Sequence, residues 1–218
     1  MILFCADNHY DTHPGRVLYA SIRDRYPIDF FEDDWSGFAG LAVGKYNLLM
    51  LNMIGGTCDV PPPDMRAEAV VKNYLAGGGS LLLLHGSSAA FSRCDWWRPL
   101  VGYRWVRPDD PDGCPPSTHP VRPYTVQVVP AAHPLAGRLQ PLQLPEDEIY
   151  INLEARGPAE VLMQTTTDEG TFVQAYACNT PWGGKILAFL PGHRPEVVSH
   201  PGVVANICLM LDELLKEE

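Results

Sequence analysis

The fold of this chain is decided by residues 77–88, which read GGGSLLLLHGSS. A second stretch with the same pattern, residues 183–193, reads GGKILAFLPGH. Short apolar runs that follow glycine and end at a turn are typical of strands buried on both faces of a parallel sheet. In open α/β sheets, ligands bind just beyond the carboxyl ends of such strands. We therefore expect His85 and His193, which follow these two runs, to lie where binding or chemistry occurs.

The composition indicates a globular α/β protein. Of the 218 residues, 46% are hydrophobic and 19% are charged, which is ordinary for one folded domain. A net charge of −10 argues against a nucleic-acid partner, because counterion release requires a basic surface. No apolar stretch approaches the roughly 20 residues that cross a membrane. Six cysteines without a CxxC pair, and the lack of a signal-peptide pattern, predict a cytoplasmic protein.

Apolar periodicity predicts the element order strand, helix, strand, strand, helix, strand, which is typical of a doubly wound sheet. Proline is concentrated between Pro99 and Pro145. This predicts that residues 100–146 form a loop-rich insertion over the sheet, within a single domain of residues 1–218. The expected strands cover residues 1–5, 28–31, 46–53, 80–84, 124–129, 148–153, 160–165, 171–177 and 185–190. The expected helices cover residues 14–25 and 63–75 and begin again near residue 201.

His85 stands at a strand-to-helix turn of small residues, HGSSAA, the geometry of a nucleophile elbow. We expect His85 to be the exposed residue of that turn, with Ser87 or Ser88 as the next candidates. The alternative is a buried histidine bonded to a carbonyl group. His193 follows a strand in the same way, and a neutral imidazole at either position can act as a general base or a metal ligand. Arg194 can clamp a carboxylate or be a surface residue.

Other polar groups stand near expected strand ends. The segment PEDEIY, residues 145–150, places carboxylates just before a predicted strand, and one of them is expected to turn inward beside Tyr150, where burial would raise its pKa. Asp7, His9 and Asp11 lie in the loop after the first strand. Together with the histidines they could bind a divalent metal, although no HExxH spacing is present.

Four histidines directly precede proline, which holds them on extended backbone. They are His13, His119, His133 and His200. For His200 we favour the structural interpretation of a helix cap. Motifs for nucleotides and for serine or cysteine nucleophiles are absent: there is no GxGxxG, P-loop, GxSxG or GxCxG, so no nucleotide cofactor is expected.

The pieces, taken in order, resemble the ThuA-like (trehalose utilisation) family. The matching stretches are His9 to Asp11, GGG through LHGS at 77–87, WRPLVG at 97–102, His119-Pro120, VQVVPAAHPL at 126–135, DEIY at 147–150, WGGK at 182–185, and Gly192-His193 with Glu196. Two departures stand out. Residues 173–176, VQAY, lack a histidine common in the family, and residues 107–118 are longer and richer in proline.

The resemblance implies a flavodoxin-like, class I glutamine amidotransferase-like three-layer sandwich with a mostly parallel central sheet. A histidine would replace the amidotransferase cysteine at the elbow. In similar proteins the strand-end histidines and the Asp-Glu pair line the site, and some bind a metal there. Members are linked to sugar metabolism, especially oxidised disaccharides.

Our leading hypothesis is an enzyme that acts on a sugar or keto-sugar by hydrolysis or proton abstraction, either with one divalent ion, Zn or Mn, or without a metal, so that His85 is a metal ligand or a base. The expected catalytic residues are His85, His193 and Glu148. The expected ligand-binding residues are Asp7, His9, Ser87, Trp97, Tyr150 and Arg194. The expected metal ligands are His85, His119 and His193.

Three tryptophans, Trp96, Trp97 and Trp105, could stack on sugar rings, but two of them are as well explained by core packing. The alternatives to an enzyme of this kind are a sugar- or metal-binding module without activity, and a glutamine amidotransferase using Cys178 or Cys58. The ligand is expected to be a small carbohydrate, and the chain could form a homo-oligomer.

Overall fold

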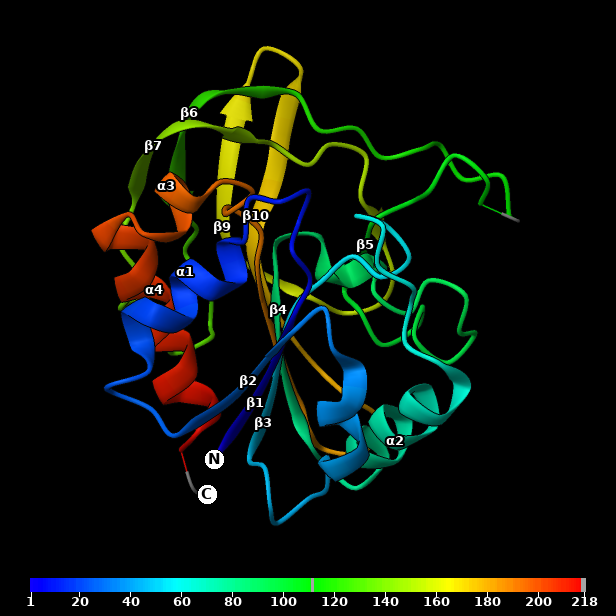
Figure 1. Ribbon diagram of the computed structural model, residues 1–218. Helices are drawn as coiled ribbons and strands as arrows, with labels where there is room; N and C mark the ends of the chain where they lie inside the picture. The colour runs from blue at the N-terminus through cyan, green and yellow to red at the C-terminus, as the bar shows by residue number, and fades with distance from the viewer. Residues whose placement is uncertain (111, 217–218) are drawn as a thin grey trace.

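The computed structural model describes residues 1–110 and 112–216, and its centre is a nine-stranded sheet within that part of the chain (Figure 1). The strand order is β2-β1-β3-β4-β11-β10-β9-β6-β7. The first five of these are parallel: β2 (Ile28–Glu32), β1 (Ile2–Ala6), β3 (Leu48–Asn52), β4 (Ser80–Leu84) and β11 (Lys185–Phe189). The other four continue the sheet with antiparallel pairing: β10 (Gly170–Asn179), β9 (Glu160–Thr167), β6 (Val121–Val128) and β7 (Leu142–Glu148).

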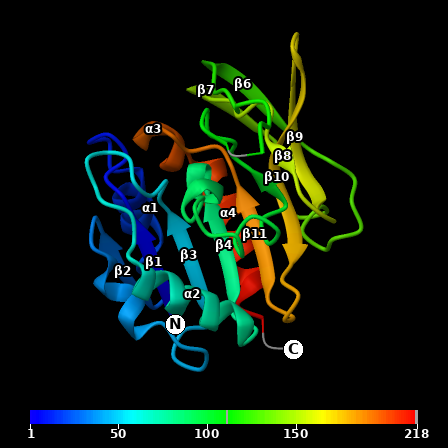
Figure 2. The ribbon, with the colours of Figure 1, turned by 90° about the vertical axis from the view of Figure 1, so that its right-hand side faces the viewer.

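Helices cover both faces of the parallel strands, which gives the predicted three-layer α/β sandwich (Figures 1 and 2). One face carries α1 (Pro14–Ile22), the short α3 (Pro195–Val198) and α4 (Pro201–Leu214). The other face carries the 3-10 helix η1 (Trp35–Gly40) and α2 (Met65–Ala76). Alternate residues of each strand serve the two cores: Phe4 packs toward α1 and α4, whereas Leu3 packs toward α2. No helix in the described part of the chain is long and apolar enough to cross a membrane.

The two glycine-rich stretches of the sequence meet where β4 and β11 begin. A Cβ atom added to Gly184 would lie 2.1 Å from the carbonyl oxygen of Gly79, and one added to Gly79 would lie 2.3 Å from the ring of Tyr74. A side chain at Gly184 would therefore hold the two strands apart, and one at Gly79 would displace the Tyr74 ring of α2. The strands then run side by side, with Ile186 aligned on Leu81 and Phe189 aligned on Leu84. This register brings the ends of the two apolar runs to the same edge of the sheet.

Most predicted elements are confirmed within two or three residues of their expected bounds, but the strand expected at 148–153 is wrong. The chain instead forms β7 at Leu142–Glu148, and only Ile151 makes an isolated bridge, with Thr118. Pro145 stands inside β7, which is possible because β7 is an edge strand and needs no amide donor on its free side. The acidic segment thus ends a strand, where a start was expected.

Residues 98–110, 112–114 and 150–159 form a layer beside the antiparallel half, where Tyr103 packs against Tyr176 of β10. This layer includes the two-stranded pair β5 (Tyr103–Arg104) and β8 (Glu154–Ala155), and β5 contacts η2 (His85–Ala89). The carboxylate of Glu154 joins this layer: Arg98, Arg104 and Arg156 contact its oxygens at 3.0, 2.7 and 2.6 Å. Charged groups therefore fix the position of the loop that continues from Arg104 to Trp105.

Candidate active site

Three histidines and one glutamate meet at the carboxyl ends of the strands. His9 follows β1, His85 follows β4, His193 follows β11, and Glu148 is the last residue of β7. All four strands run in the same direction, because two antiparallel reversals separate β11 from β9 and two more separate β9 from β7. The strand-end rule that predicts His85 and His193 therefore also accounts for the other two residues.

His85 is held in a left-handed conformation, with φ of 50°, at the first position of η2. Its Nδ1 lies 2.9 Å from the carbonyl oxygen of Leu190, so this nitrogen carries a proton and donates it. Its Nε2 faces the site, 2.7 Å from the hydroxyl of Tyr150 and 3.3 Å from Oε2 of Glu148. The expectation that His85 is the exposed residue of the turn is therefore wrong, and the alternative holds: the ring is buried and bonded to a carbonyl. Its second nitrogen contacts Tyr150 and Glu148, which line the cavity described below.

Glu148 binds several imidazoles through its two carboxylate oxygens. Besides His85 on Oε2, its Oε1 lies 2.9 Å from Nδ1 of His119 and 3.3 Å from Nδ1 of His193. Burial raises the pKa of Glu148, but the hydrogen bond and charge of His85, with His193 and His119, outweigh burial and lower the pKa to about 2. Glu148 is therefore an ionised carboxylate.

The neighbouring Asp147 is the carboxylate whose pKa is raised, and burial is the cause. It accepts hydrogen bonds from the amides of Gly192 and His193, at 2.8 and 3.0 Å, and so fixes the turn that presents the His193 ring. The expectation that burial raises the pKa of an inward-turned carboxylate therefore holds for Asp147 but is wrong for Glu148. At Asp147 burial outweighs the charge of His85 and the hydrogen bonds from backbone amides, whereas at Glu148 the direct hydrogen bond and charge of His85, with His193 and His119, outweigh burial.

The loop after β1 presents His9 through an unusual backbone. His9, Tyr10, Asp11 and His13 all have left-handed φ values between 50° and 62°, a conformation that costs non-glycine residues about 1–2 kcal/mol each. His13 is therefore left-handed, and the extended backbone predicted from its position before Pro14 is wrong. Strain of this kind persists only where the surrounding structure enforces it, and it is common at functional sites.

His9 lies between an acid and a second imidazole. Its Nε2 is 2.9 Å from Nδ1 of His193, and its Nδ1 is 3.5 Å from Oδ1 of Asp7. The other oxygen of Asp7 accepts the amide of Ile54 at 2.7 Å, whereas Oδ1 is buried with no hydrogen-bond partner. Asp7 is thus placed to orient the His9 ring. Burial lowers the pKa of His9. Burial and the charge of His85 lower the pKa of His193 to about 4. Both rings therefore favour the neutral form, which is the form that binds metals.

The donor set fits a divalent metal. One nitrogen from each of His9, His85 and His193 lies within 4.8 Å of the others. The far nitrogens of His9 and His85 face the Asp7 carboxylate and the Leu190 carbonyl, the outer arrangement that orients metal-binding histidines. The structure groups His9 with the other two rings, where the sequence suggested His119. His119 instead contacts Glu148 from the half-exposed rim.

A cavity of about 230 Å³ opens onto these groups. Trp105, Tyr150 and His119 form one wall, with ring centroids 4.7 Å apart for Trp105 and Tyr150 and 5.5 Å apart for Trp105 and His119. Tyr10 and the turn after β3, through Ile54 and Thr57, also line the cavity. Sequence reasoning did not name these last residues or Arg107, although the Gly55-Gly56 turn after a buried strand follows the same strand-end rule.

Six predicted residues do not line this cavity. His85 and Asp7 are buried and contact Glu148 and His9, which do line it. The Ser87 hydroxyl bonds the backbone of Leu51, Leu84 and Met53. Trp97 is fully buried, and its indole nitrogen donates to the carbonyl of Ser88 at 2.8 Å. Trp96 packs beside Trp97 at the edge of the same core. Arg194 pairs with Glu146 at the surface.

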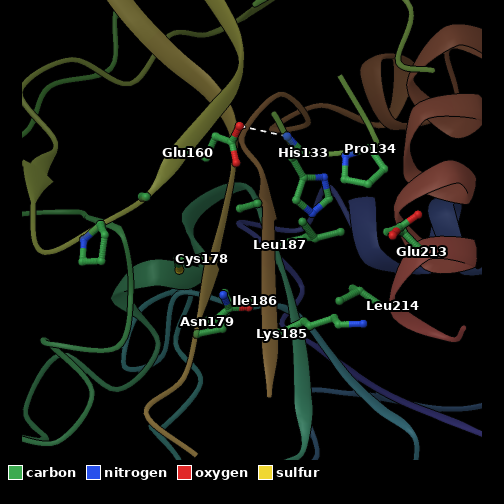
Figure 3. Close-up of a pocket in the computed structure, with 13 residues that line it drawn as sticks. His133, Pro134, Glu160, Cys178, Asn179, Lys185, Ile186, Leu187, Glu213 and Leu214 are labelled. Atoms are coloured by element: carbon green, nitrogen blue, oxygen red, sulfur yellow. Dashed lines mark hydrogen bonds between the residues drawn. The ribbon is translucent and has the colours of Figure 1, made fainter. Parts of the chain in front are cut away.

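The two cysteines considered as nucleophiles are poorly suited to that role. Burial raises the pKa of the Cys178 thiol to about 11 and raises that of Cys58 as well, so neither favours the thiolate form. Cys178 also lies far from the histidines, in a larger cavity of about 630 Å³ at the amino end of β11 (Figure 3). Ile186 and Leu187 contribute an apolar surface to that cavity. His133 and Glu160 also line it, and the backbone amide of His133 donates a hydrogen bond to the Glu160 carboxylate.

Comparisons with known proteins agree with this architecture. A crystal structure of a protein described as ThuA-like from Parabacteroides merdae has 16% identity and a TM-score of 0.71, and the match covers 94% of this chain and 86% of that one. A ThuA-like protein from Bacteroides uniformis has 13% identity and a TM-score of 0.73, covering 100% and 91% of the two chains. PurLQS from Thermotoga maritima matches at 10% identity and a TM-score of 0.60, covering 97% and 98%.

No curated protein sequence matches the chain significantly. The family described as trehalose utilisation, ThuA, matches residues 15–208, which hold His85, Glu148 and His193. The structural neighbours at 16% identity or less share the fold, and the family match covers most of the chain. The protein therefore belongs to the ThuA family.

Proposed function

We propose that this protein is an enzyme that acts on a small carbohydrate derivative by acid–base chemistry at the histidine site. The observation that carries the proposal is the convergence of His9, His85 and His193 with the ionised Glu148 beside one cavity. Aromatic rings of Trp105 and Tyr150 in the cavity wall suit the face of a sugar ring. Membership of a family described as trehalose utilisation supports the same substrate class.

A divalent ion, zinc or manganese, fits the three imidazoles. When bound, it would supply Lewis-acid polarisation of a substrate oxygen. The remaining groups would then handle the proton. Glu148 is ionised and lies next to the imidazoles, so it can accept a hydrogen bond from a substrate hydroxyl and stabilise an imidazole that takes up the proton. Burial raises the pKa of Tyr150 well above its ordinary value, so its hydroxyl keeps a proton that it can donate.

Without an ion, His85 is the base of the proposed reaction. Its Nδ1 proton is held by the Leu190 carbonyl, so in the neutral ring Nε2, which faces the Tyr150 hydroxyl and Glu148, is the nitrogen that accepts a proton. Glu148 at 3.3 Å would stabilise the imidazolium that results. Hydrolysis and proton abstraction next to a carbonyl both remain within this proposal, because each needs one base and one proton donor.

Elemental analysis of untagged protein, combined with turnover of a panel of sugars and keto-sugars, tests the proposal. About one ion per chain, lost in H85A, supports the metal-assisted form; no ion, with turnover reduced at least about tenfold in H85A and E148Q, supports the metal-free form. S92A, on the loop after η2, is the matched surface control. Unchanged turnover in both variants, with the fold intact by circular dichroism, would refute the assignment.

The second candidate is a module that binds a sugar or a metal without turnover. It is favoured by the engagement of Ser87 with the backbone and by the raised pKa of both candidate thiols, which leave no activated nucleophile among them. Saturable binding across the panel with no product, in the presence and absence of added metal, would support this candidate over the enzyme.

A further inference from the structure

Arg107 places a positive charge in the wall of the histidine site. It follows Trp105 by two residues and lines the same cavity. One of its terminal nitrogens contacts the carbonyl oxygens of Gly55 and Ile54 at 3.0 and 3.4 Å, while its Nε is buried with no hydrogen-bond partner. Within the described part of the chain, no carboxylate lies within 4.0 Å of this guanidinium. Two backbone carbonyls hold the group, but its charge is not neutralised.

Other arginines of the same layer are handled differently. Arg104 pairs with Glu154 at 2.7 Å and Asp110 at 2.6 Å, and Arg98 pairs with Glu154 at 3.0 Å. Partly desolvated cations in this region are thus normally matched by carboxylates, as the energetics of buried charges require. Arg107 is the exception, and it is also the one Lys or Arg among the described residues that line the cavity.

The volume and lining of the cavity limit which ligand can supply a negative charge for Arg107. Its volume of about 230 Å³ is below the roughly 300–1,000 Å³ of sites for drug-sized ligands, so a single sugar ring or smaller fits. Trp105 is two residues from Arg107 in the sequence, and the centroid of its ring lies 5.5 Å from that of the His119 ring. The negative charge of Glu148 is already met by histidines on both of its oxygens.

We propose that the ligand of this site is a small sugar derivative that carries an oxyanion, a carboxylate or a phosphate, which pairs with Arg107. The guanidinium fork matches either group. The sugar ring lies on Trp105, and the end away from the anion faces the histidines and Glu148. This inference rests on the proposed function for the location of the chemistry, but it concerns binding and is tested by binding.

Asp109 provides an independent prediction, because its exposed carboxylate lies on the rim of the same cavity. An anionic ligand is repelled by this charge, whereas a neutral sugar is not. D109N is therefore expected to tighten the binding of the anionic ligand a few-fold and to leave a neutral sugar unchanged. R107M is expected to do the opposite to the anionic ligand, and R107K to retain part of the affinity, since lysine keeps the charge without the planar fork.

Calorimetric titration of the full chain with glucuronate, glucose 6-phosphate and glucose tests the proposal. Wild type is expected to bind one of the two anions at least about tenfold more tightly than glucose, and R107M to lose that preference. The preferred anion identifies the carboxylate or the phosphate as the recognised group. Because Arg107 also holds two carbonyls, thermal unfolding of R107M is measured first; if that variant unfolds, D109N decides.

Equal affinity for the three sugars, no saturable binding of either anion, a preference that survives in R107M, or an unchanged anion affinity in D109N would each overturn the proposal. These results can be distinguished from a failure of the proposed enzymatic function. Preferential anion binding with no turnover of any sugar would support the pairing with Arg107 and refute the enzymatic function. Equal affinity for the three sugars, with turnover of neutral sugars, would support the enzymatic function and refute the pairing with Arg107.

Discussion

Replacing Glu154 by glutamine should destabilise the protein at neutral pH and flatten its response to acid. Burial raises the pKa of Glu154, but hydrogen bonds from Arg98, Cys114, Arg104 and Arg156 outweigh burial and lower the pKa to about 2, from an ordinary 4.5. A tenfold change in proton affinity corresponds to about 1.4 kcal/mol, so the arginines stabilise the folded state through this carboxylate by up to about 3 kcal/mol.

The sign of the pH dependence follows from the depressed pKa. The carboxylate prefers the folded state, so its contribution is complete above the unfolded-state pKa near 4.5 and is lost as the pH falls toward 2. Wild type should therefore lose stability in this window more steeply than E154Q, by an amount that approaches the same 3 kcal/mol. The free energy of unfolding, measured in urea by circular dichroism at a series of pH values, gives both curves.

Glu169 is the matched control. It pairs with Arg122 on the exposed turn between β9 and β10, where water screens the interaction, so E169Q should follow wild type closely. If the curves of wild type and E154Q run parallel between pH 4.5 and 2, the carboxylate is not the centre of the network and the reasoning is refuted. A second consequence is functional: Glu154 fixes Arg104, next to Trp105, so E154Q should also weaken ligand binding at the cavity.

Two further predictions concern the fold. G184A should lower the free energy of unfolding by about 1–3 kcal/mol, because its Cβ would lie 2.1 Å from the Gly79 carbonyl oxygen. G137A should change the free energy of unfolding little, because a Cβ at Gly137 would have no atom within 4 Å. Urea titration of both variants separates the packing effect from a general effect of alanine. H200A should cost about 1 kcal/mol, since Nδ1 of His200 accepts the Gly202 amide at the start of α4, and equal melting temperatures for H200A and wild type would contradict the capping role.

The parallel half of the sheet could be predicted because its sequence signals are local. Strands β3, β4 and β11 are continuous apolar runs, buried on both faces, and their glycines and turns mark where they end. The antiparallel half has weaker local sequence signals. Strand β7 is an edge strand that ends in three consecutive acidic residues and has a proline inside it, so its pattern resembles a loop. Its register depends on pairing with β6, which no local signal specifies.

The site shows the same division. His85 and His193 follow from the rule that ligands bind at the carboxyl ends of strands, whereas Glu148 is predicted before a strand and in fact ends β7; the structure brings the three together. The orientation of Ser87 could not be predicted, because the turn that begins at His85 points the Ser87 hydroxyl at the backbone of β3 and β4. The fate of Glu148 could not be predicted either, because its pKa depends on which cations the fold places around it.

Stability alone does not explain the histidine site. The residues that present His9 and His85 adopt left-handed backbone conformations, Asp7 keeps a buried oxygen without a hydrogen bond, and one nitrogen from each of three imidazoles lies within 4.8 Å of the others. Each feature is unfavourable for folding on its own: glycine would avoid the backbone strain, and apolar side chains would avoid the unpaired oxygen and the clustered imidazoles. Local departures from the rules of stable folding are expected where function requires them. A divalent ion would bring cationic charge beside Asp7 and Glu148 and give the converging nitrogens a common partner, so the same observations that look costly for folding support the proposed chemistry.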